Sequence, residues 1–146
     1  MNGGACASAR VRRQRRVTAL MRAATDVTIA AYRWTHPRIE KGMKPADIGA
    51  LMNAATEKLG GDPEFALILI GEAAAYPHGS RAPQIVADGQ IVLMDCGCTV
   101  QGYQSDVSRT GVHGSATADQ RKTWDQAIRG QKIAFAAARI GATAGS

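Results

Sequence analysis

Apolar residues recur every three or four positions over residues 18–33, and few helix breakers interrupt them. This period is typical of an amphipathic helix with one face turned towards a core. His36 precedes Pro37, and the residue before a proline is disfavoured in the α region, so the helix is expected to end there. The recurring apolar positions are Leu20, Ala24, Val27, Ala31 and Trp34.

Two further helices are predicted, at residues 45–59 and 116–140. Pro45 suits a first helical turn, because the N–H that proline lacks would have no helical partner there. Thr117 with Gln120 three residues later matches the capping box that begins many helices. The helix at residues 45–59 is expected to stop at the glycine pair that follows it. Its predicted core residues are Ile48, Leu51, Met52 and Ala55.

Three segments are predicted to form strands. Residues 65–70 are an uninterrupted apolar run, and residues 91–94 are a shorter one. Residues 103–110 are rich in aromatic, β-branched and hydroxyl side chains, which favour a second strand of a hairpin. Residues 71–84 contain prolines and glycine and are predicted to be a loop. The order helix, helix, strand, hairpin, helix predicts an α+β fold, with an antiparallel sheet and helices packed on one face.

The formal net charge of +6 is concentrated near the start of the sequence. Residues 1–22 hold six of the 18 basic residues and no acidic residue, which leaves 12 basic and 12 acidic residues elsewhere. We interpret residues 1–17 as a basic leader, disordered or misread, ahead of one domain at residues 18–146. The alternatives for this segment are an organellar presequence and an arm that binds the phosphates of a nucleic acid. The segment lacks a clear apolar face and aromatic residues, so a nucleic-acid partner is not expected.

No stretch approaches the roughly 18 apolar residues that a membrane span requires, so no membrane association is expected. Cys6, Cys96 and Cys98 do not form a disulfide framework, which favours a reducing, cytoplasmic compartment. Cys96 and Cys98 share one strand face and could be half of a zinc site, but buried free thiols are the expected state.

Asp95 and Asp106 carry the strongest chemical signal. If the chain reverses at Val100-Gln101, the two aspartates face each other across the hairpin. Facing Cβ atoms lie about 4.5–5.5 Å apart, where like charges repel, and a metal ion between them is the simplest resolution. A longer turn with a bulge at Gly102 would shift the pairing by one residue. Solvated aspartates at strand ends and a carboxyl pair that shares a proton also stay open.

Three motifs follow one another in an order that resembles a known family. Tyr-Pro-His-Gly occupies residues 76–79, Val-Leu-Met-Asp-Cys-Gly occupies residues 92–97, and Gly-Tyr-Gln-Ser-Asp-Val-Ser-Arg-Thr occupies residues 102–110. Together they resemble the signature of the M24 metallopeptidases, nearer the Xaa-Pro aminopeptidases and prolidase-like dipeptidases than the methionine aminopeptidases. The resemblance covers about residues 18–146 and implies the first half of a pita-bread domain.

The resemblance also implies roles for individual residues. Asp95 and Asp106 would be metal ligands, with Asp106 bridging two divalent ions of Mn, Co, Zn or Fe in the intact enzyme. Carboxylate oxygens are the hard ligands that such ions accept. His78 would line the substrate pocket and hydrogen-bond the substrate or a reaction intermediate. Arg109 and Thr110 would hold the second strand in place.

The family's remaining ligands, a histidine and two glutamates, have no counterpart among these residues. Glu72, His78 and His113 are the other candidate ligands, and none has a spacing that nominates it. We therefore expect a truncated, inactive fragment of an exopeptidase that releases the N-terminal residue from Xaa-Pro peptides, with weak or absent metal binding. The intact enzyme is expected to be a homodimer. A metal-free creatinase-like hydrolase and a non-catalytic pita-bread binding module are the alternatives.

Overall fold

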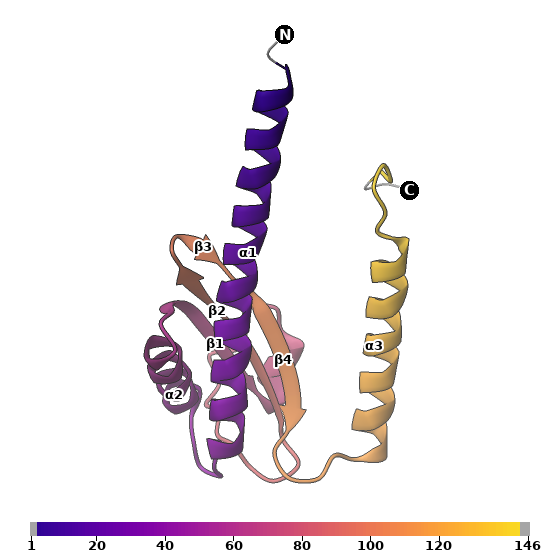
Figure 1. Cartoon of the computed structure of the whole chain (residues 1–146). Helices are drawn as coiled ribbons and strands as arrows, with labels where there is room; N and C mark the ends of the chain where they lie inside the picture. Colours follow the sequence, from indigo (N-terminus) through magenta and orange to yellow (C-terminus); the bar gives the residue numbers. More distant parts are fainter. Residues whose placement is uncertain (1–2, 144–146) are drawn as a thin grey trace.

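The computed structural model describes residues 3–143, with side chains from residue 14 onward. Helices and strands follow the predicted order (Figure 1). The helical elements are α1 (Gly3–Thr35), the 3-10 turn η1 (His36–Arg38), α2 (Pro45–Lys58), the 3-10 turn η2 (Gly71–Ala75) and α3 (Ala118–Ala137). The strands are β1 (Asp62–Ile70), β2 (Ile91–Val100), β3 (Tyr103–Gln104) and β4 (Val107–Val112).

The sheet is antiparallel throughout, with β2 at its centre. β1 pairs with one edge of β2, and β3 and β4 pair in succession with the other edge. One irregularity between Pro63 and Phe65 shifts the β1–β2 register. These pairings confirm the predicted α+β fold with an antiparallel sheet.

Helices α1 and α2 cover one face of this sheet, which we call the helix-covered face (Figure 1). The core lies between them and the strands, and the predicted inward residues Ile48, Met52 and Ala55 are buried there. Burial of such side chains from water is the main favourable contribution to folding. The core also contains Ala31 and Tyr32 from α1, Ile68 and Ile70 from β1, Val92, Met94 and Cys96 from β2, and Val107 from β4.

Helix α1 begins earlier than the sequence predicted. It starts at Gly3 rather than near residue 18, so it continues through most of the basic segment. Residues 5–17 contain neither proline nor glycine and are rich in alanine and arginine, which are good helix formers. At its other end α1 stops at Thr35, and η1 follows at the predicted His36-Pro37 position. The role of residues 1–17 stays a prediction, and residues 1 and 2 lie outside the described part.

Helix α3 does not join the layer formed by α1 and α2. Its predicted capping box is present, since the Gln120 amide lies 3.2 Å from the Thr117 hydroxyl and the Thr117 amide 2.8 Å from the Gln120 side-chain oxygen. Beyond this first turn α3 runs beside the sheet without lying on it (Figure 1), and none of its residues is buried. Phe135 is 84% exposed. The expectation that all helices pack on the sheet therefore holds for α1 and α2 alone.

The hairpin turns one residue later than predicted. Val100 pairs with Tyr103, so Gln101 and Gly102 form the two-residue turn. Their φ angles are 50° and 79°, and positive φ at both central residues is the pattern of a type I′ turn. That turn matches the right-handed twist of the strands, which outweighs the strain of a left-handed glutamine.

No helix within residues 3–143 combines the length and the apolar character needed to cross a membrane.

Candidate metal centre

The late turn changes the partner of Asp95. Asp95 pairs with Ser108 and Cys96 with Val107, so the predicted facing pair of Asp95 and Asp106 is wrong. The register is displaced by two residues. A displacement of one would have moved Asp106 to the other face of the sheet, whereas a displacement of two keeps it on the same face.

The neighbours of the two aspartates confirm that they share a face. Met94 and Cys96 on either side of Asp95 are buried beneath α1, so Asp95 points away from the helices. Ser105 and Val107 on either side of Asp106 are likewise buried, and Asp106 is exposed. Both carboxylates therefore stand on the face opposite to α1 and α2, diagonal rather than opposite to each other. We call it the open face.

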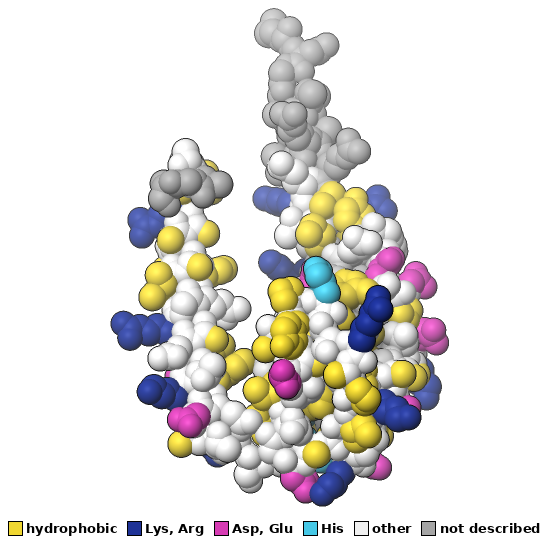
Figure 2. Space-filling model, turned by 180° about the vertical axis from the view of Figure 1, so that it is seen from behind, with side chains coloured by type: hydrophobic (Ala, Val, Ile, Leu, Met, Phe, Trp, Pro, Cys, Tyr) yellow, Lys and Arg dark blue, Asp and Glu magenta, His cyan; other side chains and the backbone are white. Residues whose placement is uncertain are grey.

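On the open face one hydrogen bond fixes Asp95. The Ser108 hydroxyl donates to Asp95 Oδ1 at 2.7 Å. Across the other edge of β2, Leu67 is the paired residue of Asp95, and Phe65 follows two positions along with 39% of its surface exposed. Figure 2 views the molecule from behind and shows hydrophobic side chains spread over this side. The carboxylates thus lie among apolar groups that still reach solvent.

His78 reaches the same face through a tight turn. The Gly79 amide donates to the Tyr76 carbonyl at 3.0 Å, and Pro77 takes the second turn position that proline favours. Gly79 has φ +78°, and a Cβ there would lie 2.5 Å from Leu69 Cδ2. Leu69 is two residues from Leu67 on β1, so the turn packs directly on the open face. The His78 side chain itself is exposed.

Gln84 anchors the segment that carries this turn. Its side-chain oxygen accepts from the Ile70 amide at 2.8 Å, and its side-chain nitrogen donates to the Ser80 carbonyl at 3.2 Å. Glu72, a candidate ligand, accepts from the Tyr76 hydroxyl at 3.4 Å. The two bonds of Gln84 link the end of β1 to the segment after the turn, so the loop that carries His78 is tied to the sheet at both ends.

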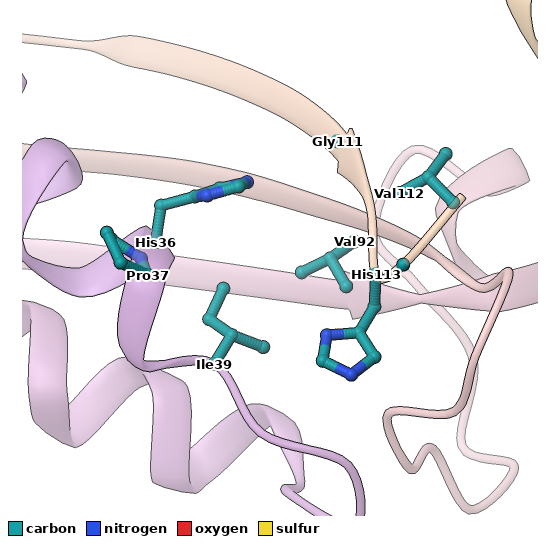
Figure 3. Close-up of a pocket in the computed structure, with 8 residues that line it drawn as sticks. His36, Pro37, Ile39, Val92, Gly111, Val112 and His113 are labelled. Carbon is teal, nitrogen blue, oxygen red and sulfur yellow. The ribbon is translucent and has the colours of Figure 1, made fainter. Parts of the chain in front are cut away.

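His113, another candidate ligand, lies elsewhere. With His36 it lines a cavity of about 280 Å³, and Figure 3 shows the two imidazoles on different sides of it. Val92 in the same cavity belongs to the core under the helices, so the cavity opens on the helix-covered face. His113 Nε2 lies 3.9 Å from Asp88 Oδ1, and Asp88 also pairs with Lys41 at 2.7 Å. His113 is therefore not a partner of the two aspartates.

Comparison with known proteins connects this arrangement to a family. The model of metallopeptidase family M24 matches residues 19–146. The chain is a member of this family. Its fold corresponds to a part of the pita-bread architecture of the M24 peptidases of known structure.

Two curated M24 relatives and one solved structure illustrate the likeness. An Xaa-Pro dipeptidase of Pyrococcus furiosus is 32% identical over 108 residues, which are 73% of this chain and 31% of the relative. An uncharacterized peptidase of Schizosaccharomyces pombe is 35% identical over 102 residues, 67% of this chain and 22% of the relative. The crystal structure of the prolidase from Pyrococcus horikoshii OT3 superposes with a TM-score of 0.75 at 26% identity, covering 82% of this chain and 35% of that one. The chain thus spans about a third or less of these relatives.

M24 enzymes are dinuclear metalloenzymes, and the open face fits part of such a centre. Two carboxylates with hard oxygen donors stand on the open face, Asp95 on β2 and Asp106 between β3 and β4. Among the side chains that the structure describes, those of residues 14–143, however, no group of three or more His, Cys, Asp or Glu is placed to hold a metal ion. The donors suit a hard divalent cation, but they do not enclose one.

On the helix-covered face the thiols are structural. Cys96 and Cys98 are free and buried, as predicted. Burial raises the pKa of the Cys96 thiol to about 11, so this thiol is protonated at neutral pH. The Thr28 hydroxyl lies 2.7 Å from the Ser105 hydroxyl and 3.2 Å from Cys98 Sγ, which binds α1 to the hairpin behind Asp106.

Sequence reasoning missed two residues that support the open face. Ser108 was not singled out, because a turn at Val100-Gln101 pairs Asp95 with Asp106 instead. A glycine at the second turn position was the signal that could have corrected the register. Tyr32 was not singled out either. Its hydroxyl lies 2.8 Å from the Met94 carbonyl and 2.7 Å from the Val107 carbonyl, so it fixes the backbone beside Asp95 and Ser108.

Proposed function

We propose that this chain forms part of a metal-dependent exopeptidase that releases the N-terminal residue from Xaa-Pro peptides. Asp95 and Asp106 are the metal ligands in this proposal, and His78 contacts the substrate. The supporting observation is that the two carboxylates and the turn that carries His78 share the open face of one sheet. The Xaa-Pro class is supported by the likeness to an Xaa-Pro dipeptidase and to a prolidase.

Each residue has a distinct task. Asp95 and Asp106 would hold the divalent ions, of Mn, Co, Zn or Fe. When bound, the ions supply a Lewis acid and an activated water for peptide hydrolysis. His78 donates a hydrogen bond to the substrate carbonyl and stabilises negative charge there. The apolar residues beside Asp95 exclude water from the bound peptide.

We also propose that residues 1–146 by themselves do not turn over substrate. Two carboxylates leave most coordination positions of two ions to other donors, and a tight site needs more protein ligands. A metal-free creatinase-like reaction does not account for a pair of aspartates on one face. Homodimer formation in the intact enzyme and a cytoplasmic location stay predictions.

Metal binding tests the assignment directly. Titration of the purified chain with Mn²⁺, followed by the electron paramagnetic resonance signal of the free ion, is expected to reveal weak binding. Asp95→Asn and Asp106→Asn should each abolish it, because the amide removes charge with little change of shape. Asp125→Asn on the exposed surface of α3 is the matched control. Equal Mn²⁺ binding by all three variants would exclude a metal site at the two aspartates.

A hydrolysis assay tests the substrate class. In the Pyrococcus furiosus dipeptidase, the matched segment can be replaced by the corresponding residues of this chain. The chimera is expected to cleave Xaa-Pro dipeptides and to lose activity with Asp95→Asn or His78→Ala. A folded, metal-loaded chimera that prefers dipeptides without proline would contradict the Xaa-Pro assignment. Turnover and tight stoichiometric metal in the unfused chain would contradict its proposed inactivity.

A further inference from the structure

Ser108 and Asp95 form a directly facing pair across the β2–β4 ladder. The Ser108 hydroxyl donates to Asp95 Oδ1 at 2.7 Å, a short distance that suits a bond to a charged acceptor. The bond engages one carboxylate oxygen and leaves Oδ2 available. A serine side chain has a single heavy-atom rotation, so its hydroxyl is held in place at small entropic cost.

The backbone beneath this pair is held from the helix-covered face. Val107, next to Ser108, is buried, and its carbonyl lies 2.7 Å from the Tyr32 hydroxyl. The Met94 carbonyl, next to Asp95, lies 2.8 Å from the same hydroxyl. One buried tyrosine thus contacts both strands at the positions that present Ser108 and Asp95. The buried Tyr32 therefore fixes the backbone positions from which Ser108 and Asp95 project on the open face.

The two aspartates differ in this respect. Among the residues whose side chains the structure describes, Asp106 makes no side-chain hydrogen bond, whereas Asp95 makes one. Each carboxylate oxygen has two lone pairs, so a hydrogen bond to one oxygen can orient the group and still leave it able to bind a cation. A carboxylate that binds a cation through one oxygen has a higher affinity for it when a hydrogen bond already holds the carboxylate in the required orientation.

We propose that Ser108 is a positioning residue for the metal centre, because its hydroxyl orients the Asp95 carboxylate through Oδ1 and leaves Oδ2 available to a cation. This inference rests on the proposed function. Hydrogen-bond partners of ligating carboxylates typically change metal affinity about 10- to 100-fold when they are removed. Ser108 touches neither the substrate nor the metal in this role, and it acts through Asp95.

The test compares Mn²⁺ binding by the full chain and its variants, using paramagnetic broadening of backbone amides near residue 95. Ser108→Ala should weaken Mn²⁺ binding about tenfold or more. Ser108→Thr keeps a hydroxyl and suits a strand, so it should restore the affinity. Ser115→Ala makes the same change at an exposed serine beyond β4 and should leave the affinity unchanged. Thermal melting of each variant checks that the fold is retained.

The outcomes separate the inference from the function it rests on. If Asp95→Asn abolishes Mn²⁺ binding and Ser108→Ala does not weaken it, Ser108 has no positioning role although the metal site stands. If Ser108→Thr fails to restore affinity in a folded protein, the hydroxyl is not the responsible group, and the inference fails. If Asp95→Asn binds Mn²⁺ like the unchanged chain, the proposed metal site itself is wrong.

Discussion

The two faces of the central strand β2 differ in burial and in the kind of side chain that they carry. On the helix-covered face, Met94, Cys96 and Cys98 are almost completely buried against α1 and its neighbours. On the open face, Asp95 lies between Met94 and Cys96 in sequence and is half-buried, and among the described side chains it is hydrogen-bonded to Ser108 alone. Alternation along one strand therefore separates the residues that stabilise the fold from those that can bind a ligand.

This contrast explains why two carboxylates can share the open face. An exposed carboxylate keeps its hydration, whereas the same group under α1 would lose it at high cost. The rigid, apolar side supplies a fixed backbone, and the solvated side carries the charge. If the two faces differ in this way, substitutions on them should differ in their effect on stability and on metal binding.

Substitutions at two adjacent residues of β1 should differ most clearly in how much they lower the free energy of unfolding. Ile68 is 4% exposed and belongs to the core, whereas Leu67 faces the open side and is only partly buried. Ile68→Ala should lower the free energy of unfolding by about 2–5 kcal/mol, and Leu67→Ala by about half of that or less, because it removes less buried surface. Urea unfolding followed by circular dichroism measures both. Equal losses would mean that the open face carries as much packing as the covered one.

The buried thiol predicts a dependence of stability on pH. Burial raises the pKa of Cys96 to about 11, and burial also raises the pKa of Tyr32. Both groups hold their protons more tightly in the folded state, so their contribution is fully present below about pH 9. The free energy of unfolding should fall by about 2–3 kcal/mol as the pH rises from 9 to 11.

Cys96→Ala isolates the thiol. Under reducing conditions this variant should lose less stability between pH 9 and pH 11 than the unchanged chain does. The decline that remains should come from Tyr32 and begin nearer pH 10, the ordinary value for a phenol. An identical decline in both proteins would show that Cys96 does not titrate as its burial requires.

The smallest effect on stability is expected at Asp106. This carboxylate is exposed, so Asp106→Asn should change the free energy of unfolding by less than about 0.5 kcal/mol. The same variant should lose Mn²⁺ binding. Thermal unfolding with and without Mn²⁺ measures the two effects together. A loss of stability above about 1 kcal/mol without metal would assign Asp106 a structural role instead.

The strands and helices could be predicted from local patterns, but the register of the hairpin could not. Period and breakers locate the C-terminal end of α1, both ends of α2 and the apolar parts of β1 and β2, because burial of one face imposes them. The turn depended on whether Gln101 would accept a left-handed conformation, and its local preference argues against that. Pairing along the whole of β2 with β3 and β4 outweighs the preference of that one residue.

Helix α3 illustrates the opposite case. Its capping box and composition predict a helix correctly, yet those local features contain no information about what the helix packs against. In the described residues its side chains stay exposed, so the helix is present without joining the sheet. Propensity determines that a helix forms, whereas packing depends on surfaces that the local pattern does not specify.

The α+β class and the family follow from residue types and their spacing along the sequence. So do the aspartates and the histidine that carry the proposed chemistry. Only the tertiary structure decided that Asp95 faces Ser108 and that the His78 turn packs over Leu69 on the same face. These contacts join segments distant along the chain, and their geometry follows from the packing of strands, turn and helices together.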